Sequence, residues 1–264
     1  MPMTALPVIS PDGMISADAL PADAVSCQLN GQTVGYFLDS TSRCITDVAR
    51  LTEQSLQSDA VMILYIDGLG WDLFRRSDLP FIKHRFPCEC ARTTFPPVTH
   101  STMASMMTGE QPDRHGIISR RCHSVSAPSL LRHEESLLIE ADEELIRLEK
   151  PAVLTLPEAN ETKDHAVLTA ALQQLNAHPR LIIVHFHGLD DLEHDHGDDL
   201  SFLTDKLYEL DSACAELCSH FKGTVILCAD HGVHLANGTG HHGDFDYRDM
   251  YIPLGVAHFE GLDR

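Results

Sequence analysis

The chain has 264 residues, of which 43% are hydrophobic, and its formal net charge is -20. This length accommodates one large domain or two small ones, and no apolar run is long enough to span a bilayer, so we expect no membrane partner. The negative charge argues against a nucleic-acid polymer as partner, because phosphate-rich polymers are repelled. A small phosphate ester stays compatible with it, since bound divalent ions reverse the charge locally.

Targeting signals and cysteine pattern point to the same compartment. Residues 1–12 contain no basic stretch followed by an apolar block, so no secretory signal is expected and the prediction is a cytoplasmic protein. The eight cysteines are scattered without C-x-x-C pairs, which favours reduced thiols over a disulfide framework or a cysteine-rich zinc site. Cys214 and Cys218 lie four residues apart and are expected to pack inside a helix.

The first 59 residues form a lead-in region that we expect to pack on the core. Residues 1–22 are rich in proline and alanine and are predicted to be irregular. Asn30-Gly31 separates two strand-like runs and predicts a hairpin over Val25–Phe37. Helical spacing of apolar residues follows over Arg43–Leu56.

Residues 60–264 show the alternation of strands and helices that is typical of a mostly parallel sheet with helices on both faces. Three continuous apolar runs read as strands buried on both sides, at Ala60–Ile66, Leu181–Phe186 and Thr224–Ala229. Further strands are expected at Cys88–Thr93, Ala152–Leu156 and Met250–Val256. Helices are expected at Trp71–Arg76, Pro80–Phe86, Asp164–Ala177 and Asp198–Phe221, and the acidic segment Glu134–Lys150 is expected to be a surface helix.

The segment Arg92–Gly116 joins an extended stretch to a helix. Pro96 and Pro97 disfavour helix before them, whereas residues 100–108 are small or unbranched and end at Gly109. Thr99 therefore sits at a helix N-terminus, where unpaired N–H groups favour an anion such as a phosphoryl group. An ordinary helix cap is the alternative interpretation of an isolated threonine at this place.

Metal-ligating residue types follow each of the buried strands. Asp67 ends the first, Asp190 and His194 follow the second at helical spacing, and Asp230-His231 ends the third. The carboxyl ends of parallel strands form the edge where open α/β sheets bind ligands. Gathering so many carboxylates is costly unless cations neutralise them, so the pattern predicts a metal site.

The ordered motifs resemble the alkaline phosphatase superfamily, and most closely its nucleotide pyrophosphatase/phosphodiesterase branch. The resemblance covers about residue 60 to the end and rests on six motifs: I-D-G-L-G at Asp67, the Thr99 loop and helix ending in T-G, P-D-R-H-G at 112–116, D-x-x-E-H at 190–194, A-D-H-G at 229–232 and H-H-G at 241–243. It implies an alkaline phosphatase-like catalytic domain over residues 60–264, with its metal site at the carboxyl ends of the strands.

The resemblance also implies the site residues. Two divalent ions are expected, usually zinc, with manganese as the other ion that fits mixed oxygen and nitrogen ligands. One ion is assigned to Asp67, Asp230 and His231 and touches the Thr99 hydroxyl. The other is assigned to Asp190, His194 and His242, where His242 is chosen over His241 because it directly precedes Gly243. Thr99 is preferred to Thr93 and Thr94 as nucleophile because it lies ten residues before Gly109.

The resulting prediction is a metal-dependent hydrolase of small phosphoric esters, a phosphodiesterase or nucleotide pyrophosphatase that acts through a phospho-threonine. Arg120 stands where family phosphodiesterases commonly carry an asparagine, and a charged clamp there suits a phosphomonoester. A phosphomonoesterase is therefore the alternative enzyme, and a solvated Arg120 is the alternative role for that residue. A non-catalytic metal-binding or partner-binding module is the alternative from another class. Sulfatase activity is disfavoured, because no C/S-x-P-x-R sequence occupies the Thr99 turn.

Overall fold

The computed structural model describes residues 24–29, 32–38, 43–159 and 161–261. The predicted irregular segment 1–22 lies outside these residues. The predicted hairpin is confirmed, since β1 (Ala24–Leu29) and β2 (Gln32–Leu38) pair antiparallel as a two-stranded sheet of their own.

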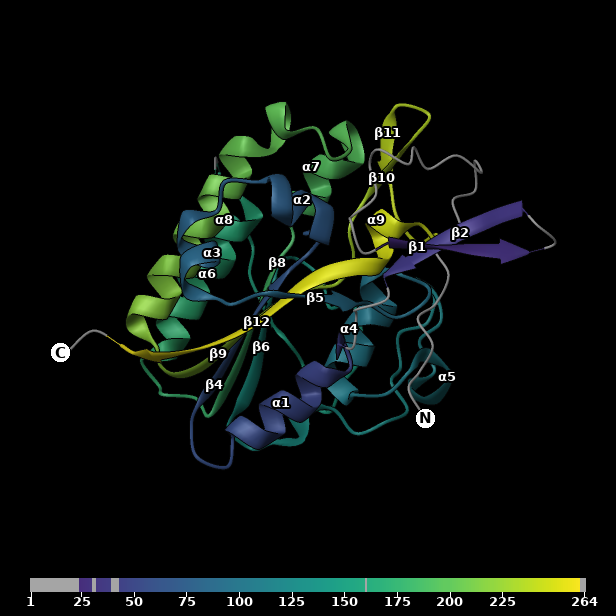
Figure 1. Cartoon of the computed structure of the whole chain (residues 1–264). Coiled ribbons are helices and arrows are strands. Elements are labelled where there is room, and N and C mark those ends of the chain that lie inside the picture. The colour runs from purple at the N-terminus through teal and green to yellow at the C-terminus, as the bar shows by residue number, and fades with distance from the viewer. Residues whose placement is uncertain (1–23, 30–31, 39–42, 160, 262–264) are drawn as a thin grey trace.

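An eight-stranded sheet forms the centre of the protein (Figure 1), in the order β3-β5-β12-β9-β4-β8-β6-β7. Its strands are β3 (Arg43–Cys44), β4 (Val61–Ile66), β5 (Glu89–Arg92), β6 (Ser136–Glu140), β7 (Val153–Leu154), β8 (Leu181–Phe186), β9 (Lys222–Ala229) and β12 (Tyr251–Glu260). Neighbouring strands are parallel except at β12, which runs antiparallel to both β5 and β9. The predicted fold class, a mostly parallel α/β sheet, is confirmed.

The three apolar runs of the sequence form adjacent strands in the middle of this sheet. β4 pairs with β8 on one side and β9 on the other, and Ile66 lies opposite both Phe186 and Ala229. Every residue of β4 and β8 is buried, because helices cover both faces of the sheet. The carboxyl ends of the three strands therefore lie level with one another.

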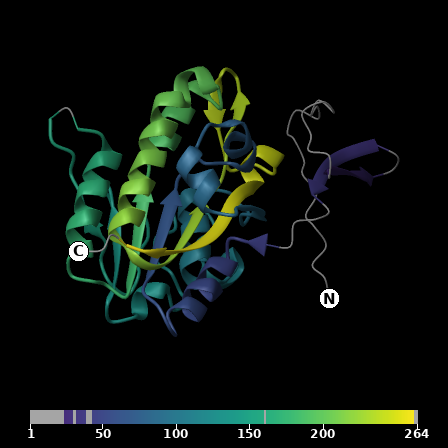
Figure 2. The same ribbon diagram turned by 60° about the vertical axis from the view of Figure 1, so that its left-hand side comes forward.

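Helices pack on both faces of the sheet, and the two views show them as layers on either side of it (Figures 1 and 2). α6 (Lys163–Leu175) and α8 (Leu200–His220) lie together on one face, whereas α1 (Asp47–Ser55) and α4 (Thr99–Thr108) lie together on the other. The short helices are α2 (Trp71–Arg76), α3 (Pro80–Arg85), α5 (Pro112–His115), α7 (Gly188–His196) and α9 (Tyr247–Met250). None of the helices within the described ranges combines the length and apolarity that a membrane span requires.

The lead-in region contributes directly to the main sheet. Arg43 and Cys44 pair with β5 as an edge strand, and Ile45 and Val48 are fully buried in the core. The predicted helix over Arg43–Leu56 thus begins later, at Asp47. The division into a lead-in region over residues 1–59 and a catalytic domain over residues 60–264 stays a prediction.

The expected surface helix over Glu134–Lys150 is wrong. Its first part is the parallel strand β6, followed by an irregular segment in which Leu145 and Ile146 are buried. The five residues S-L-L-I-E form too short an apolar run to stand out among the surrounding acidic residues, and pairing with β8 decides their conformation.

The segment before the H-H-G motif forms a short hairpin. β10 (His234–Ala236) and β11 (Thr239–His241) pair antiparallel, and β11 packs against α7. Cys214 and Cys218 are buried in α8, as their four-residue spacing predicts.

Candidate metal centre

Asp67 and Asp230 lie side by side at the carboxyl ends of β4 and β9. Both side chains are buried, and together with His231 they offer ligand atoms within 4.8 Å of one another. The backbone N–H of Gly68 donates to Asp230 Oδ1 at 3.0 Å, which fixes the orientation of that carboxylate. Gly68 can do so because it has a φ of +81°, which a glycine adopts without strain.

Thr99 lies next to this group. Its Oγ1 is 3.3 Å from His231 Nε2, and the same nitrogen is 3.0 Å from Asp230 Oδ2. Thr99 is the first residue of α4 and is half-buried, whereas Thr93 and Thr94 are buried away from this contact. Val98 precedes the helix and has no side-chain oxygen to cap it, so Thr99 is not a capping residue.

Asp190, His194 and His242 lie on the other side of His231. Asp190 and His194 are one turn apart on α7, with His194 Nε2 3.2 Å from Asp190 Oδ2. His242 Nε2 is 3.9 Å from Asp190 Oδ1, and its ring stacks on that of His231 with centroids 3.7 Å apart. His241 points elsewhere and contacts Thr239 Oγ1 at 3.0 Å. The seven residues predicted to bind metal are therefore gathered in one place.

A buried aspartate anchors the start of α7. Asp164 Oδ1 accepts hydrogen bonds from the backbone N–H groups of His187 at 2.8 Å and Gly188 at 3.0 Å. Its Oδ2 is 3.4 Å from Lys206 Nζ, and both side chains are buried. This contact positions the helix that carries Asp190 and His194.

Arg120 reaches the centre from the segment that follows α5. Its Nη2 contacts His242 Nε2, and the side chain is exposed. The guanidinium is thus at the rim of the centre and accessible to a substrate.

The donor set fits divalent cations. Among the carboxylate oxygens buried without a hydrogen-bond partner are Asp67 Oδ1 and Asp190 Oδ1. Buried oxygens left without a donor are costly, and a cation supplies the missing partner. Carboxylates and imidazoles in this proportion suit Zn²⁺ or Mn²⁺.

The protonation states of the isolated side chains show the same need for positive charge. Burial and the neighbouring Asp230 raise the pKa of Asp67 well above its usual range. Burial opposes ionisation of Asp230 too, but the charge and hydrogen bond of His231 lower its pKa. Burial and the charge of His231 lower the pKa of His242 to about 3, so its ring is neutral, and its Nε2 accepts from the Arg120 guanidinium.

Three ionisable residues near Asp67 were not among the predicted metal ligands. His185 in β8 and His187 just before α7 lie beside Asp67, and Glu140 at the end of β6 contacts both rings. Glu140 was hidden in the segment predicted to be a surface helix. The position of Glu140 at the carboxyl end of a strand is the signal that could have identified it as part of the centre.

The fold and these residues define an α/β protein with a centre of buried carboxylates and imidazoles beside a helix-terminal hydroxyl. The profile of the type I phosphodiesterase / nucleotide pyrophosphatase family matches residues 61–123 and 137–246, more than half of the chain. The chain belongs to this family, and the predicted place in the alkaline phosphatase superfamily is confirmed.

Individual relatives are distant. Among solved structures, murine ectonucleotide pyrophosphatase / phosphodiesterase 5 (ENPP5, NPP5) matches with a TM-score of 0.49 and 16% sequence identity. The match covers 67% of this chain and 58% of that chain, so this chain spans somewhat more than half of that protein. No curated protein matches the sequence significantly.

Proposed function

We propose that this protein is a metal-dependent phosphoric ester hydrolase, a phosphodiesterase or nucleotide pyrophosphatase whose nucleophile is the Thr99 hydroxyl. The observation that carries the proposal is the contact of Thr99 Oγ1 with His231 at 3.3 Å, beside buried carboxylates that lack hydrogen-bond donors. Family membership supports the reaction class.

The residues present would hold two divalent ions, one on Asp67, Asp230 and His231 and one on Asp190, His194 and His242. Such ions supply Lewis acidity, which lowers the pKa of a nearby hydroxyl and stabilises charge on phosphoryl and leaving oxygens. Asp190 Oδ2 is 3.2 Å from His194 Nε2, whereas the ring of His242 is held through its Nδ1, which is 3.0 Å from the carbonyl oxygen of Pro97.

In this proposal Thr99 attacks phosphorus. Its oxygen forms the new P–O bond as the ester oxygen departs, which leaves a phospho-threonine that water then cleaves. The N–H groups of the first turn of α4 would favour negative charge on the non-bridging oxygens. Thr99 is half-buried, which is compatible with access of a substrate to its hydroxyl.

A phosphomonoesterase is the second candidate, and a specific observation favours it. Arg120 contacts His242 at the rim of the centre, where a guanidinium can bind two oxygens of a dianionic phosphate. A diester has one negative charge fewer and gains less from this clamp.

The test is hydrolysis of bis-p-nitrophenyl phosphate and p-nitrophenyl phosphate by zinc-loaded wild type and the Thr99→Ala variant. We expect turnover of the diester by the wild type, at least 10³-fold faster than by the variant by order of magnitude. Acid quenching followed by mass spectrometry should find a phosphoryl group on the peptide that contains Thr99. Preference for the monoester would move the assignment to a phosphatase. Turnover that survives in Thr99→Ala would rule out the nucleophile, and inactivity on both esters would favour the binding-module alternative.

A further inference from the structure

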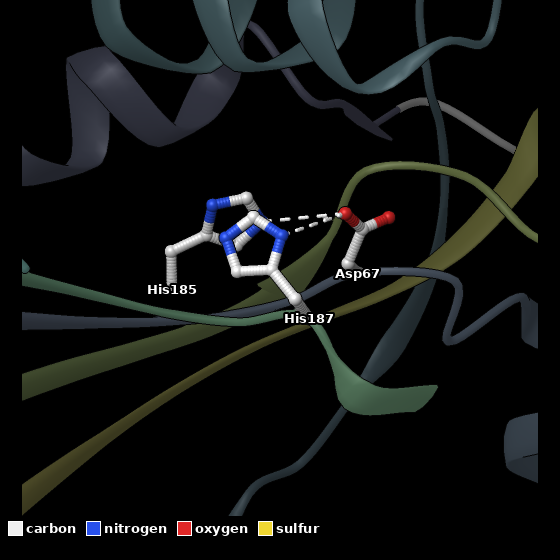
Figure 3. Close-up of side chains that lie close together, drawn as sticks. All are labelled: Asp67, His185 and His187. Atoms are coloured by element: carbon white, nitrogen blue, oxygen red, sulfur yellow. Dashed lines mark ion pairs between the residues drawn. The ribbon is translucent and has the colours of Figure 1, made fainter. Parts of the chain in front are cut away.

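A second group of buried side chains lies behind Asp67, on the side away from Asp230. It consists of His185, His187 and Glu140, and Figure 3 shows the two imidazoles converging on one oxygen of Asp67. His185 Nε2 and His187 Nδ1 are each 3.6 Å from Asp67 Oδ2. The side chains of His185, Glu140 and Asp67 are 0%, 1% and 4% exposed, so water does not account for their interactions.

The sheet places these residues together. β6, β8 and β4 are adjacent parallel strands, and Glu140, His185 and Asp67 lie at or just beyond their carboxyl ends. His187 follows two residues after His185, where Asp164 holds the backbone at the start of α7. The geometry is thus fixed by the core of the fold and not by a surface loop.

Glu140 determines which ring nitrogens carry protons. Its Oε2 lies 3.1 Å from His185 Nδ1 and 2.9 Å from His187 Nε2. Both contacts have hydrogen-bond geometry, and a carboxylate oxygen only accepts hydrogen bonds. Both contacting nitrogens must therefore be N–H donors.

The remaining ring nitrogens, His185 Nε2 and His187 Nδ1, then face Asp67 Oδ2. His185 Nε2 is buried without a hydrogen-bond partner. The ligand atoms of Asp67, His185 and His187 lie within 4.8 Å of one another. Each of the two nitrogens is 3.6 Å from Asp67 Oδ2, too far for a hydrogen bond but close to the roughly 3.3 Å between ligands of a tetrahedral ion with 2.0–2.1 Å bonds.

We propose that Asp67, His185 and His187 form a further binding site for a divalent transition-metal cation such as Zn²⁺, separate from the two proposed catalytic ions. Glu140 orients both imidazoles through their N–H groups, the arrangement that usually supports histidine ligands of a metal. Asp67 bridges the two regions, since its Oδ1 faces His231 at 3.4 Å whereas its Oδ2 faces the two histidines. The site does not depend on Thr99 chemistry and holds whether or not the proposed hydrolase activity exists.

The test is the number of zinc ions bound per chain, measured by elemental mass spectrometry after loading the apo-protein with Zn²⁺ and removing the excess. We expect three ions in the wild type and two in His187→Gln and His185→Gln. His115→Gln is the matched control, because His115 is also fully buried but contacts Ser105 Oγ and the Ile117 N–H. Circular dichroism verifies that each variant is folded, and the partly exposed His187 offers the more tolerant position should His185→Gln not fold.

The difference in the number of bound zinc ions between wild type and His187→Gln tests this site. The number of ions that His187→Gln still binds tests the proposed function. If wild type and His187→Gln bound the same number of zinc ions, the proposed site would be overturned. This includes the result in which both bind two ions, which only the two proposed catalytic sites would then hold. One ion in the wild type that His187→Gln loses and Asp190→Asn retains would support the site and contradict the catalytic pair. We also expect Glu140→Gln to weaken binding of the third ion by about 10- to 100-fold. Unchanged affinity would exclude the positioning role of Glu140.

Discussion

Replacing Asp164 by alanine should destabilise the protein by about 3–5 kcal/mol. The carboxylate accepts from two backbone N–H groups at the start of α7 at 2.8 and 3.0 Å, and such bonds to a charged acceptor contribute about 1.5–3 kcal/mol each. Breaking a buried ion pair costs about 3–5 kcal/mol by itself, but Lys206 keeps a second partner in Glu209 at 2.6 Å. These effects overlap, so they do not add.

Urea unfolding followed by circular dichroism measures this loss. The control is Asp191→Ala in the first turn of α7, where the side chain is 55% exposed and pairs with Lys163 at 3.3 Å. We expect the control to cost less than about 1 kcal/mol, because exposed ion pairs contribute little. If Asp164→Ala were as stable as the control, the anchoring of α7 by this carboxylate would be refuted. If it were destabilised as expected, zinc binding should weaken as well, since α7 carries Asp190 and His194.

Three further predictions concern other parts of the centre. Burial and the charge of Asp190 raise the pKa of Glu193 well above its usual range, so the folded chain holds a proton that the unfolded chain releases. The free energy of unfolding should therefore fall as pH rises above about 4.5, and Glu193→Gln should remove this pH dependence. If wild type and variant showed the same pH dependence of the free energy of unfolding between about pH 5 and 8, the reasoning would be contradicted. Gly232→Ala should lower the free energy of unfolding by about 2 kcal/mol or more, measured by thermal unfolding, because a methyl group there overlaps backbone atoms of two other segments. Gly238→Ala is the control: its methyl group meets no neighbour, so it should cost only about 1 kcal/mol for its positive φ. Arg120→Ala should reduce kcat/KM for a phosphomonoester by about 10-fold or more and for a diester by less, with Arg121→Ala as the neighbouring exposed control; equal losses on both esters would exclude a clamp for the dianion.

The central strands and the candidate ligands were predictable because their signals are local. Unbroken apolar runs before Asp67 and Asp230 read as buried strands, and parallel pairing brings their ends to one edge. The four-residue spacing of Asp190 and His194 needed only a helical turn, which α7 provides.

What could not be predicted depends on pairing between distant segments. β6 is a strand because β8 offers it an edge, and nothing in its own five residues outweighs the acidic residues around it. Glu140 was missed for that reason, and with it the grouping of His185 and His187 around two carboxylates. A histidine at the end of an apolar strand looks like a packed core residue until its carboxylate partner is known.

The strand order also decides when the centre can form. β4 pairs with β8 and β9, whose sequences begin more than a hundred residues later, so the chain must close very long loops before Asp67 meets its neighbours. Folds dominated by such non-local contacts reach their transition state slowly. A metal ion at this centre would therefore meet its complete ligand set only after the sheet has assembled, and it would stabilise the finished protein without guiding its folding.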